Sequence, residues 1–157
     1  MTLAGELRLL VLAAQREGNR LLSEQLRPLG LTPSQSEVIR VLHESQPLSL
    51  IELGELLVCE TGSPSRLVDG LVKSGIVERL PSTTDQRKVV LSLTKQGDAL
   101  NEQISSIEQR FESLFTHIGD EATLTTTMEI LWRFVEDKPA GEALAKRLGR
   151  KPYKQEK

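Results

Sequence analysis

The apolar positions at the start of the chain recur every three or four residues, which is the spacing of one face of an α-helix. They are Leu3, Leu7, Leu10, Val11, Ala14, Leu21, Leu22 and Leu26. Pro28 ends the pattern, because proline lacks the backbone N–H that a continuing helix requires. The pattern therefore predicts a long amphipathic helix at the N-terminus.

Three shorter helices are predicted to follow, each opened by a capping signal. Two signals are capping boxes, in which a hydroxyl side chain and a residue three positions later satisfy each other's backbone N–H groups. The third is a serine followed by proline, a residue favoured at the first helical position. The signals are Thr32 with Gln35, Ser49 with Glu52, and Ser63 with Pro64. The second and third helices are short and close together, which favours a helix-turn-helix.

Alternating apolar and polar residues after position 75 are typical of strands. Residues 76–80 and 89–93 are predicted to pair as a β-hairpin, and the turn-forming residues 81–87 give it an exposed polar tip. Two amphipathic helices are predicted beyond the hairpin, one capped by Thr94 and a second that ends before Pro139. Their apolar positions are Leu100, Ile104, Ile107, Phe111, Leu114 and Ile118, then Leu124, Met128, Leu131, Phe134 and Val135.

This order of elements predicts a mainly α fold with a small β-hairpin wing, a winged helix-turn-helix flanked by dimerisation helices. We assign residues 32–94 to the winged helix-turn-helix DNA-binding domain. We assign residues 1–31 and 95–137 to a helical dimerisation region, because a winged domain alone does not need two long terminal helices with continuous apolar faces. The alternative is that these helices fold back within one chain. Residues 138–157 form a basic C-terminal tail, with a short helix over 141–148.

The overall composition fits a folded protein but does not by itself indicate DNA binding. Hydrophobic residues make up 38% of the 157 positions, and the formal net charge is −2. DNA binding therefore needs a local basic surface. Residues 61–95 provide one, since they carry six basic and three acidic side chains. The chain has no ~20-residue apolar run and no signal-peptide layout, so we expect a cytoplasmic protein without membrane contact.

The third short helix carries residues that could read DNA, because in a winged helix-turn-helix this helix enters the major groove. Arg66 can donate two hydrogen bonds to guanine, and Ser63 and Ser65 can reach bases or phosphates. Lys73 extends the same face. An ordinary solvated helix would show a similar pattern, so this helix alone leaves both interpretations open.

The hairpin favours the DNA-binding interpretation. Its tip carries Arg87 and Lys88, and Arg79 lies on the incoming strand. A loop of this length could place Arg87 against the minor groove, where narrow A·T-rich segments attract arginine.

Three motifs follow one another along the winged segment. They are Leu-Val-x-x-Gly-x-Val-x-Arg at residues 71–79, Asp-x-Arg at 85–87, and Leu-Thr followed by Gly97. Together they resemble the MarR family of bacterial regulators, and the flanking helices extend the resemblance over residues 3–135. The resemblance implies a triangular homodimer with intertwined first and last helices. Such a two-fold dimer would set its recognition helices about one DNA turn apart, ~34 Å, on a pseudo-palindromic operator.

The resemblance also implies roles for single residues. Asp85 is expected to orient the basic side chains of the wing. Pro64 is a departure, because it removes a backbone donor at the DNA-facing start of the helix. The expected DNA contacts are Ser63, Pro64, Ser65, Arg66 and, in the wing, Arg87.

The family further implies a cleft for a small aromatic or anionic effector between the dimer helices and the winged unit. Arg16, Arg40 and His43 are candidates because they are polar and lie on helices near that cleft. His43 and His117 could belong to a ligand or metal site with Glu44 or Glu112, but we favour the interpretation that both are ordinary helix residues. One cysteine and two histidines cannot form a tetrahedral Cys/His zinc site, and we expect neither a metal nor a cofactor.

Cys59 precedes the recognition helix and has two interpretations. Some relatives sense oxidants through cysteine, which would make this chain a redox-responsive regulator. Alternatively, Cys59 is a small buried apolar residue. The basic residues from Lys146 to Lys157 likewise either attract phosphates or belong to a solvated chain end.

The sequence thus predicts a sequence-specific double-stranded DNA-binding transcriptional regulator, a repressor released by a small-molecule effector, with an activator as an open variant. A winged-helix protein-interaction module is the alternative from another class, although it would tolerate a neutral or acidic recognition helix. No enzyme is expected, because the chain lacks a Gly-rich phosphate loop, a nucleophile elbow and a credible metal set.

Overall fold

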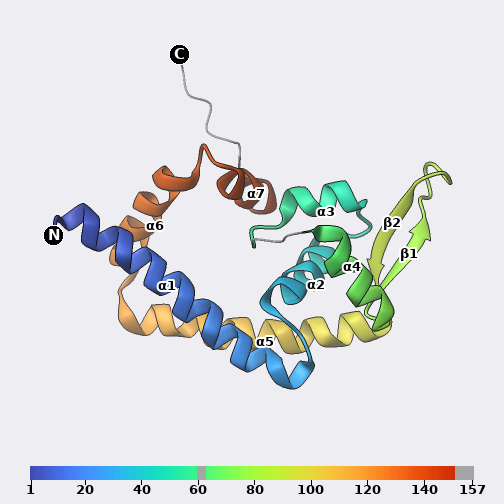
Figure 1. The fold of residues 1–157 in the computed structure, drawn as a ribbon, viewed down its shortest axis with the longest axis horizontal. Helices are drawn as coiled ribbons and strands as arrows, with labels where there is room; N and C mark the ends of the chain where they lie inside the picture. The colour runs from blue at the N-terminus through green and yellow to red at the C-terminus, as the bar shows by residue number, and fades with distance from the viewer. Residues whose placement is uncertain (60–62, 151–157) are drawn as a thin grey trace, which may run out of the picture.

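The computed structural model of the chain describes residues 1–59 and 63–150. In these residues α1 to α4 come first, a β-hairpin follows, and α5 to α7 complete the fold (Figure 1). The helices are α1 (Leu3–Leu26), α2 (Pro33–Ser45), α3 (Leu50–Leu56), α4 (Pro64–Lys73), α5 (Lys95–Ile118), α6 (Glu121–Val135) and α7 (Pro139–Arg147). The strands are β1 (Val77–Pro81) and β2 (Val89–Leu93). This architecture confirms the predicted mainly α fold class with a β-hairpin.

The capping signals explain where the helices of the winged unit begin. Both predicted capping boxes are present, with their reciprocal hydrogen bonds 2.7–3.2 Å long. Thr94 caps α5 as predicted, because its hydroxyl accepts the N–H of Gly97 at 3.2 Å. Ser63 stands at the N-cap position of α4, but its hydroxyl lies 2.7 Å from Ser65 Oγ instead of accepting a backbone N–H. The start of α4 is therefore less firmly capped than the sequence predicts.

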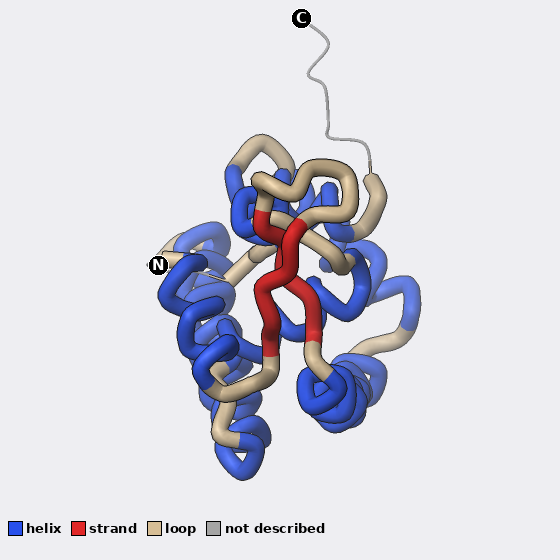
Figure 2. The backbone as a smooth tube through the Cα atoms, turned by 90° about the vertical axis from the view of Figure 1, so that its right-hand side faces the viewer, coloured by secondary structure: helices blue, strands red, loops and turns tan. Residues whose placement is uncertain are grey.

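The hairpin projects from one end of the molecule, with helices behind it on both sides (Figure 2). Its strands are antiparallel, and the register runs from Val77 opposite Leu93 to Pro81 opposite Val89. The first strand begins one residue later than predicted, because the N–H of Ile76 donates to Leu71 and so closes α4. Thr94, in turn, donates its N–H to Ile76 at 3.0 Å, which fixes α5 to the base of the hairpin.

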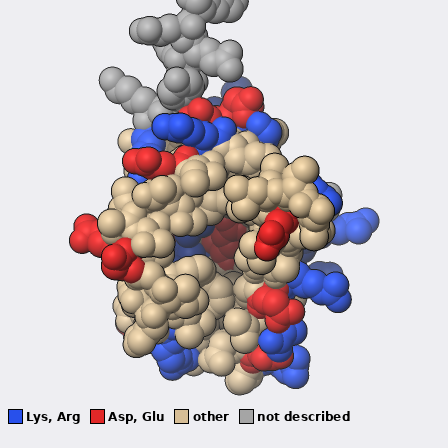
Figure 3. Space-filling view, turned by 90° about the vertical axis from the view of Figure 1, so that its left-hand side faces the viewer, with Lys and Arg blue, Asp and Glu red and all other residues tan. Residues whose placement is uncertain are grey.

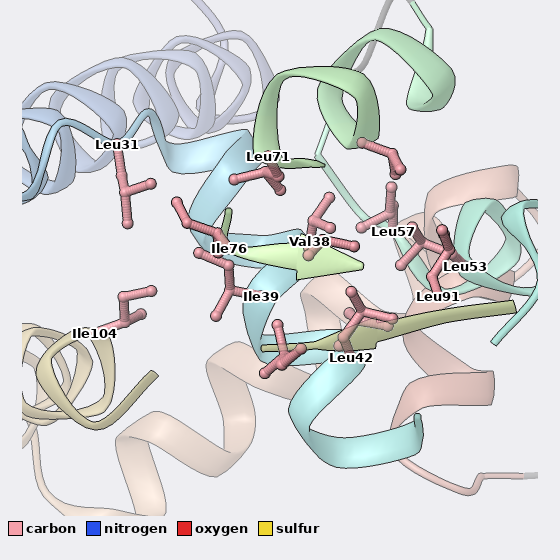
Figure 4. Close-up of a cluster of buried hydrophobic side chains, with 14 of the residues drawn as sticks. Leu31, Val38, Ile39, Leu42, Leu53, Leu57, Leu71, Ile76, Leu91 and Ile104 are labelled. Carbon is pink, nitrogen blue, oxygen red and sulfur yellow. The ribbon is translucent and has the colours of Figure 1, made fainter. Parts of the chain in front are cut away.

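The hydrophobic core joins all the elements of the winged unit and extends to α1 and α5 (Figure 4). Ile39 of α2, Leu53 of α3 and Leu71 of α4 are almost completely buried, and Leu91 of β2 completes the cluster. Ile104 of α5 is also fully buried there, so the long helix is part of the same core. Each fully buried leucine or isoleucine contributes about 1.5–3 kcal/mol. This core fixes α4 and the hairpin relative to each other.

By contrast, α1, the end of α5 and α6 keep large apolar side chains exposed. None of the residues of α6 is buried. The most exposed apolar side chains outside the chain terminus include Leu10 at 59%, Ile118 at 82% and Phe134 at 63%. On the side opposite the hairpin, the surface is mostly uncharged around a hollow that contains acidic and basic side chains (Figure 3).

The last helix, α7, folds back from α6 and lies against α3 (Figure 1). The turn between α6 and α7 brings Gly141 so close to Val135 that a Cβ atom at Gly141 would lie 1.9 Å from the Val135 carbonyl oxygen. Ala143 and Ala145 are buried in the contact. The helix predicted at 141–148 is therefore present and packed, and residues 151–157 of the predicted tail lie outside the described residues.

Candidate nucleic-acid interface

The predicted recognition helix presents its cations to solvent. Val68 and Leu71 are buried in the core, whereas Arg66 and Lys73 are exposed on the outer face. Ser63, Pro64 and Ser65 are half-buried at the start of the helix. The inner face of α4 is held in the core, and its outer face is open to a large ligand such as a DNA duplex.

The hairpin tip is a structured turn that carries two more exposed cations, Arg87 and Lys88. Ser82 donates its N–H to Lys88 at 2.8 Å, and Lys88 donates its N–H to the Asp85 carbonyl at 2.9 Å. These backbone bonds hold the tip while leaving the long side chains free to extend.

Asp85 shapes this tip through the backbone. Its carboxylate accepts the N–H of Arg87 at 3.1 Å, the pattern by which aspartate stabilises a turn two residues on. The resemblance implied that Asp85 orients basic side chains of the wing, and the bond seen here reaches the backbone of one such residue.

The cation on the incoming strand is engaged within the unit. Arg79 of β1 forms an ion pair with Asp69 of α4, with 2.5 Å between Nη2 and Oδ1. Both side chains are about half exposed. Arg79 therefore contributes less to the basic surface than the sequence suggested, and the cations available on the winged unit are chiefly Arg66, Lys73, Arg87 and Lys88.

Lys88 also lies near the start of α3. The pKa of Glu52 is lowered mainly because its carboxylate accepts hydrogen bonds from Ser49, with a smaller contribution from the charge of Lys88. The wing tip and the N-terminus of α3 thus lie at the same edge of the winged unit.

The three effector candidates occupy separate environments. Arg40 is mostly buried between α2 and α5, where it donates to Asn101 at 2.9 Å and lies 2.8 Å from a Glu108 oxygen. His43 lies 3.7 Å from Asp98, and Arg16 is exposed on α1. Burial raises the pKa of Glu108, while the neighbouring cations Arg40 and Arg147 oppose this shift. Arg40 thus already has internal partners, and its role toward an effector stays a prediction.

Surface clefts lie beside the winged unit in the described part of the chain. One, of about 470 Å³, lies between α3 and α7 and is lined by Leu57, Cys59, Ala143 and Lys146 among others. Another, of about 230 Å³, lies between α1 and α5 and includes Leu22 and Phe111. Neither cleft is lined by Arg16, Arg40 or His43.

Cys59 borders the larger cleft as a partly buried thiol. Burial, reinforced by the nearby Glu37 carboxylate, raises the pKa of Cys59 to about 12. Because the thiolate is the reactive form, this environment opposes oxidation and favours the interpretation of Cys59 as a small packing residue.

A cluster that the sequence did not reveal lies beside Cys59. The Glu37 carboxylate accepts the backbone N–H groups of Val58 and Cys59, each at 2.8 Å, and pairs with Arg147 of α7. The partners of Glu37 are 21, 22 and 110 positions away, so no local pattern signals this cluster.

The winged unit matches a known family model, described as the MarR family, over residues 31–89. A longer match is with the HTH-type transcriptional regulator FarR of Neisseria gonorrhoeae, which is 32% identical over 108 residues covering 66% of this chain and 74% of FarR. The chain belongs to the MarR family. The sequence resemblance is thereby confirmed.

Other relatives extend this comparison within the MarR family. The multiple antibiotic resistance protein MarR of Escherichia coli is 38% identical over 94 residues, a match that covers 60% of this chain and only 65% of that protein. A mutant of Escherichia coli MarR solved in complex with operator DNA is similar over 86% of this chain and 99% of that one, with a TM-score of 0.74 and 29% identity.

Two negative findings apply to residues 1–59 and 63–150. No helix there is long and apolar enough to cross a membrane. No group of three or more histidine, cysteine, aspartate or glutamate side chains is placed to hold a metal ion.

Proposed function

We propose that this MarR-family chain is a transcriptional regulator that binds double-stranded DNA sequence-specifically. The observation that carries the proposal is the common placement of exposed cations on α4 and on the hairpin tip, both fixed by one core. The likeness to an Escherichia coli MarR mutant solved on operator DNA supports it.

The proposed contacts divide between the two grooves. The start of α4, with Ser63, Pro64, Ser65 and Arg66, enters the major groove, and Lys73 binds the phosphate backbone at the other end of the helix. Arg87 and Lys88 reach the adjacent minor groove or its phosphates. The net charge of −2 is compatible with this, because the cations that matter are concentrated on the winged unit.

The proposed active form is a homodimer built on α1, α5 and α6. Their large apolar side chains remain exposed in a single chain, which is unusual unless a partner covers them. A two-fold dimer implies two half-sites about one helical turn apart. In this division, residues 32–94 read DNA, and residues 1–31 and 95–137 dimerise.

The proposed mode of regulation is repression in the cytoplasm, without enzymatic activity, relieved when a small aromatic or anionic effector binds between the dimer helices and the winged unit. Arg16, Arg40 and His43 remain the candidate effector contacts.

Selection of bound duplexes from a random pool tests the proposal directly. Enrichment of a pseudo-palindrome is the expected result, together with a light-scattering mass of two chains at micromolar concentration. Failure to enrich any sequence at low salt would overturn sequence-specific DNA binding. If a particle of one-chain mass enriches a single half-site, the proposed homodimer would be overturned and sequence-specific DNA binding would stand.

A further inference from the structure

The end of α3 is held by one buried carboxylate. Glu37 of α2, whose side chain is only 13% exposed, accepts the N–H of Val58 on one oxygen and that of Cys59 on the other, both at 2.8 Å. Val58 and Cys59 follow Leu57, the C-cap of α3. In a continued helix their N–H groups would donate to carbonyls four positions earlier, and here the Glu37 carboxylate accepts them instead. Glu37 thus fixes the chain where it leaves α3.

That carboxylate has one cation from a distant part of the chain. Arg147 of α7 lies 3.3 Å from Glu37 and 3.2 Å from Glu44, and its own side chain is 23% exposed. A buried carboxylate without a cation is costly, because the charge has left water without compensation. Arg147 therefore provides the compensating charge for this carboxylate and orients it.

The position of Arg147 depends on the docking of α7 rather than on chance contact of a flexible side chain. Gly141 permits the close turn after α6, and Ala143 and Ala145 are buried. The pair of Lys146 with Glu55 of α3 is about half exposed and adds little to this docking, because water screens it. The buried contacts hold α7 in place even without Arg147.

The anchored segment adjoins the recognition helix. Cys59 is four positions before Ser63, the N-cap of α4, and consecutive Cα atoms are only ~3.8 Å apart. The start of α4 also rests against α3, since a Cβ at Gly54 would lie 3.8 Å from Pro64 Cγ. The place of the backbone at Val58 and Cys59 therefore limits where the recognition helix can begin.

We propose that Arg147 is a positioning residue for DNA reading, acting through Glu37 and the backbone of Val58 and Cys59 on the start of α4. This inference rests on the proposed DNA-binding function. In this proposal α7 does not attract DNA phosphates. Its Arg147 orients the Glu37 carboxylate inside the winged unit and does not touch DNA.

The test compares Arg147→Ala with Lys146→Ala, a matched control on the same helix that removes the same charge but pairs with Glu55 instead of Glu37. Binding to the selected duplex is measured as a function of salt. We expect Arg147→Ala to weaken binding about threefold to tenfold without changing its salt slope. Lys146→Ala should stay within about twofold of the unaltered chain, and Arg147→Lys should restore most of the affinity.

The single cysteine of the chain supplies a second readout that does not need DNA. Because Cys59 donates its N–H to Glu37, release of this anchor should speed alkylation of the Cys59 thiol by iodoacetamide at least severalfold in Arg147→Ala and not in Lys146→Ala. Thermal unfolding of each variant shows that the fold is retained, and in Arg147→Lys the alkylation rate should return toward that of the unaltered chain.

Unchanged affinity or unchanged alkylation in Arg147→Ala overturns the positioning role. Equal losses in both variants with a smaller salt slope also overturn it, because α7 would then bind phosphates directly. If the unaltered chain selects no duplex, the proposed function fails, while the alkylation rates still show whether Arg147 anchors the backbone beside Cys59.

Discussion

Arg79 of β1 and Asp69 of α4 form an ion pair that ties the first strand of the wing to the recognition helix, with 2.5 Å between Nη2 and Oδ1. The side chains are 42% and 53% exposed, so water screens their attraction. The pair therefore matters more for relative placement than for stability.

Removal of this pair should change stability only slightly. We expect a coupling free energy below about 1 kcal/mol between Asp69 and Arg79, the range of exposed ion pairs. A double-mutant cycle with Asp69→Ala and Arg79→Ala, followed by denaturant unfolding, measures it. A coupling above about 2 kcal/mol would contradict the view that the pair is solvent-screened.

Replacement of Arg87 by alanine should weaken duplex binding by about 1–3 kcal/mol and leave the fold intact. The side chain is exposed at the wing tip, and only the backbone of Arg87 is used in the turn. The slope of the logarithm of the binding constant against the logarithm of salt concentration should fall by the equivalent of about one phosphate contact per subunit. The control is Arg8→Ala, which removes an exposed cation of α1, a helix away from the hairpin (Figure 1). An equal loss of duplex affinity in Arg8→Ala would show that the wing is not part of the DNA interface.

Phe134→Glu should dissociate the proposed dimer. Phe134 is 63% exposed on α6, and a glutamate there would bring a charged group into an apolar interface. Light scattering at micromolar concentration should give one chain mass. Ile51→Glu tests specificity, because Ile51 is 76% exposed on α3, outside the dimerisation helices, and should leave two chains associated.

Gly141→Ala should displace α7, since the added Cβ would lie 1.9 Å from the Val135 carbonyl oxygen. The single tryptophan, Trp132, reports this change, because the Arg150 guanidinium lies 5.0 Å from its ring centre. We expect altered tryptophan emission in Gly141→Ala. Gly119→Ala should leave the spectrum unchanged, because a Cβ there meets ordinary contacts at 3.6 Å or more.

Alkylation of Cys59 should be slow at pH 8 and should increase up to strongly alkaline pH. The folded pKa of about 12 lies above that of an exposed thiol, so the protonated form persists through the neutral range. We expect a rate at least about 100-fold below that of a small free thiol at pH 8. Fast alkylation with a midpoint near pH 7, together with peroxide-induced loss of duplex binding, would restore the redox-responsive alternative.

The sequence predicted those parts of the fold that local signals determine. The capping boxes at Thr32 and Ser49 act over three residues, and both are present. The apolar spacing of α5 likewise located a helix that contributes Ile104 to the core.

Interactions between distant positions escaped prediction. Arg147 and Glu37 are 110 positions apart and meet only because α7 folds back on α3. The same holds at the candidate interface, where composition identified Arg79 as basic but could not show that Asp69 already neutralises it. Whether a charge is available depends on its neighbours in space, which the sequence pattern does not give.

The uncovered apolar face of α6 has a consequence for abundance. If α6 is covered only in the proposed dimer, the free energy of unfolding rises with chain concentration by mass action. The melting temperature should then increase on concentrating the protein, and newly made chains at low copy number would be the form most open to proteolysis. The level at which the regulator accumulates would thus be set partly by its own assembly.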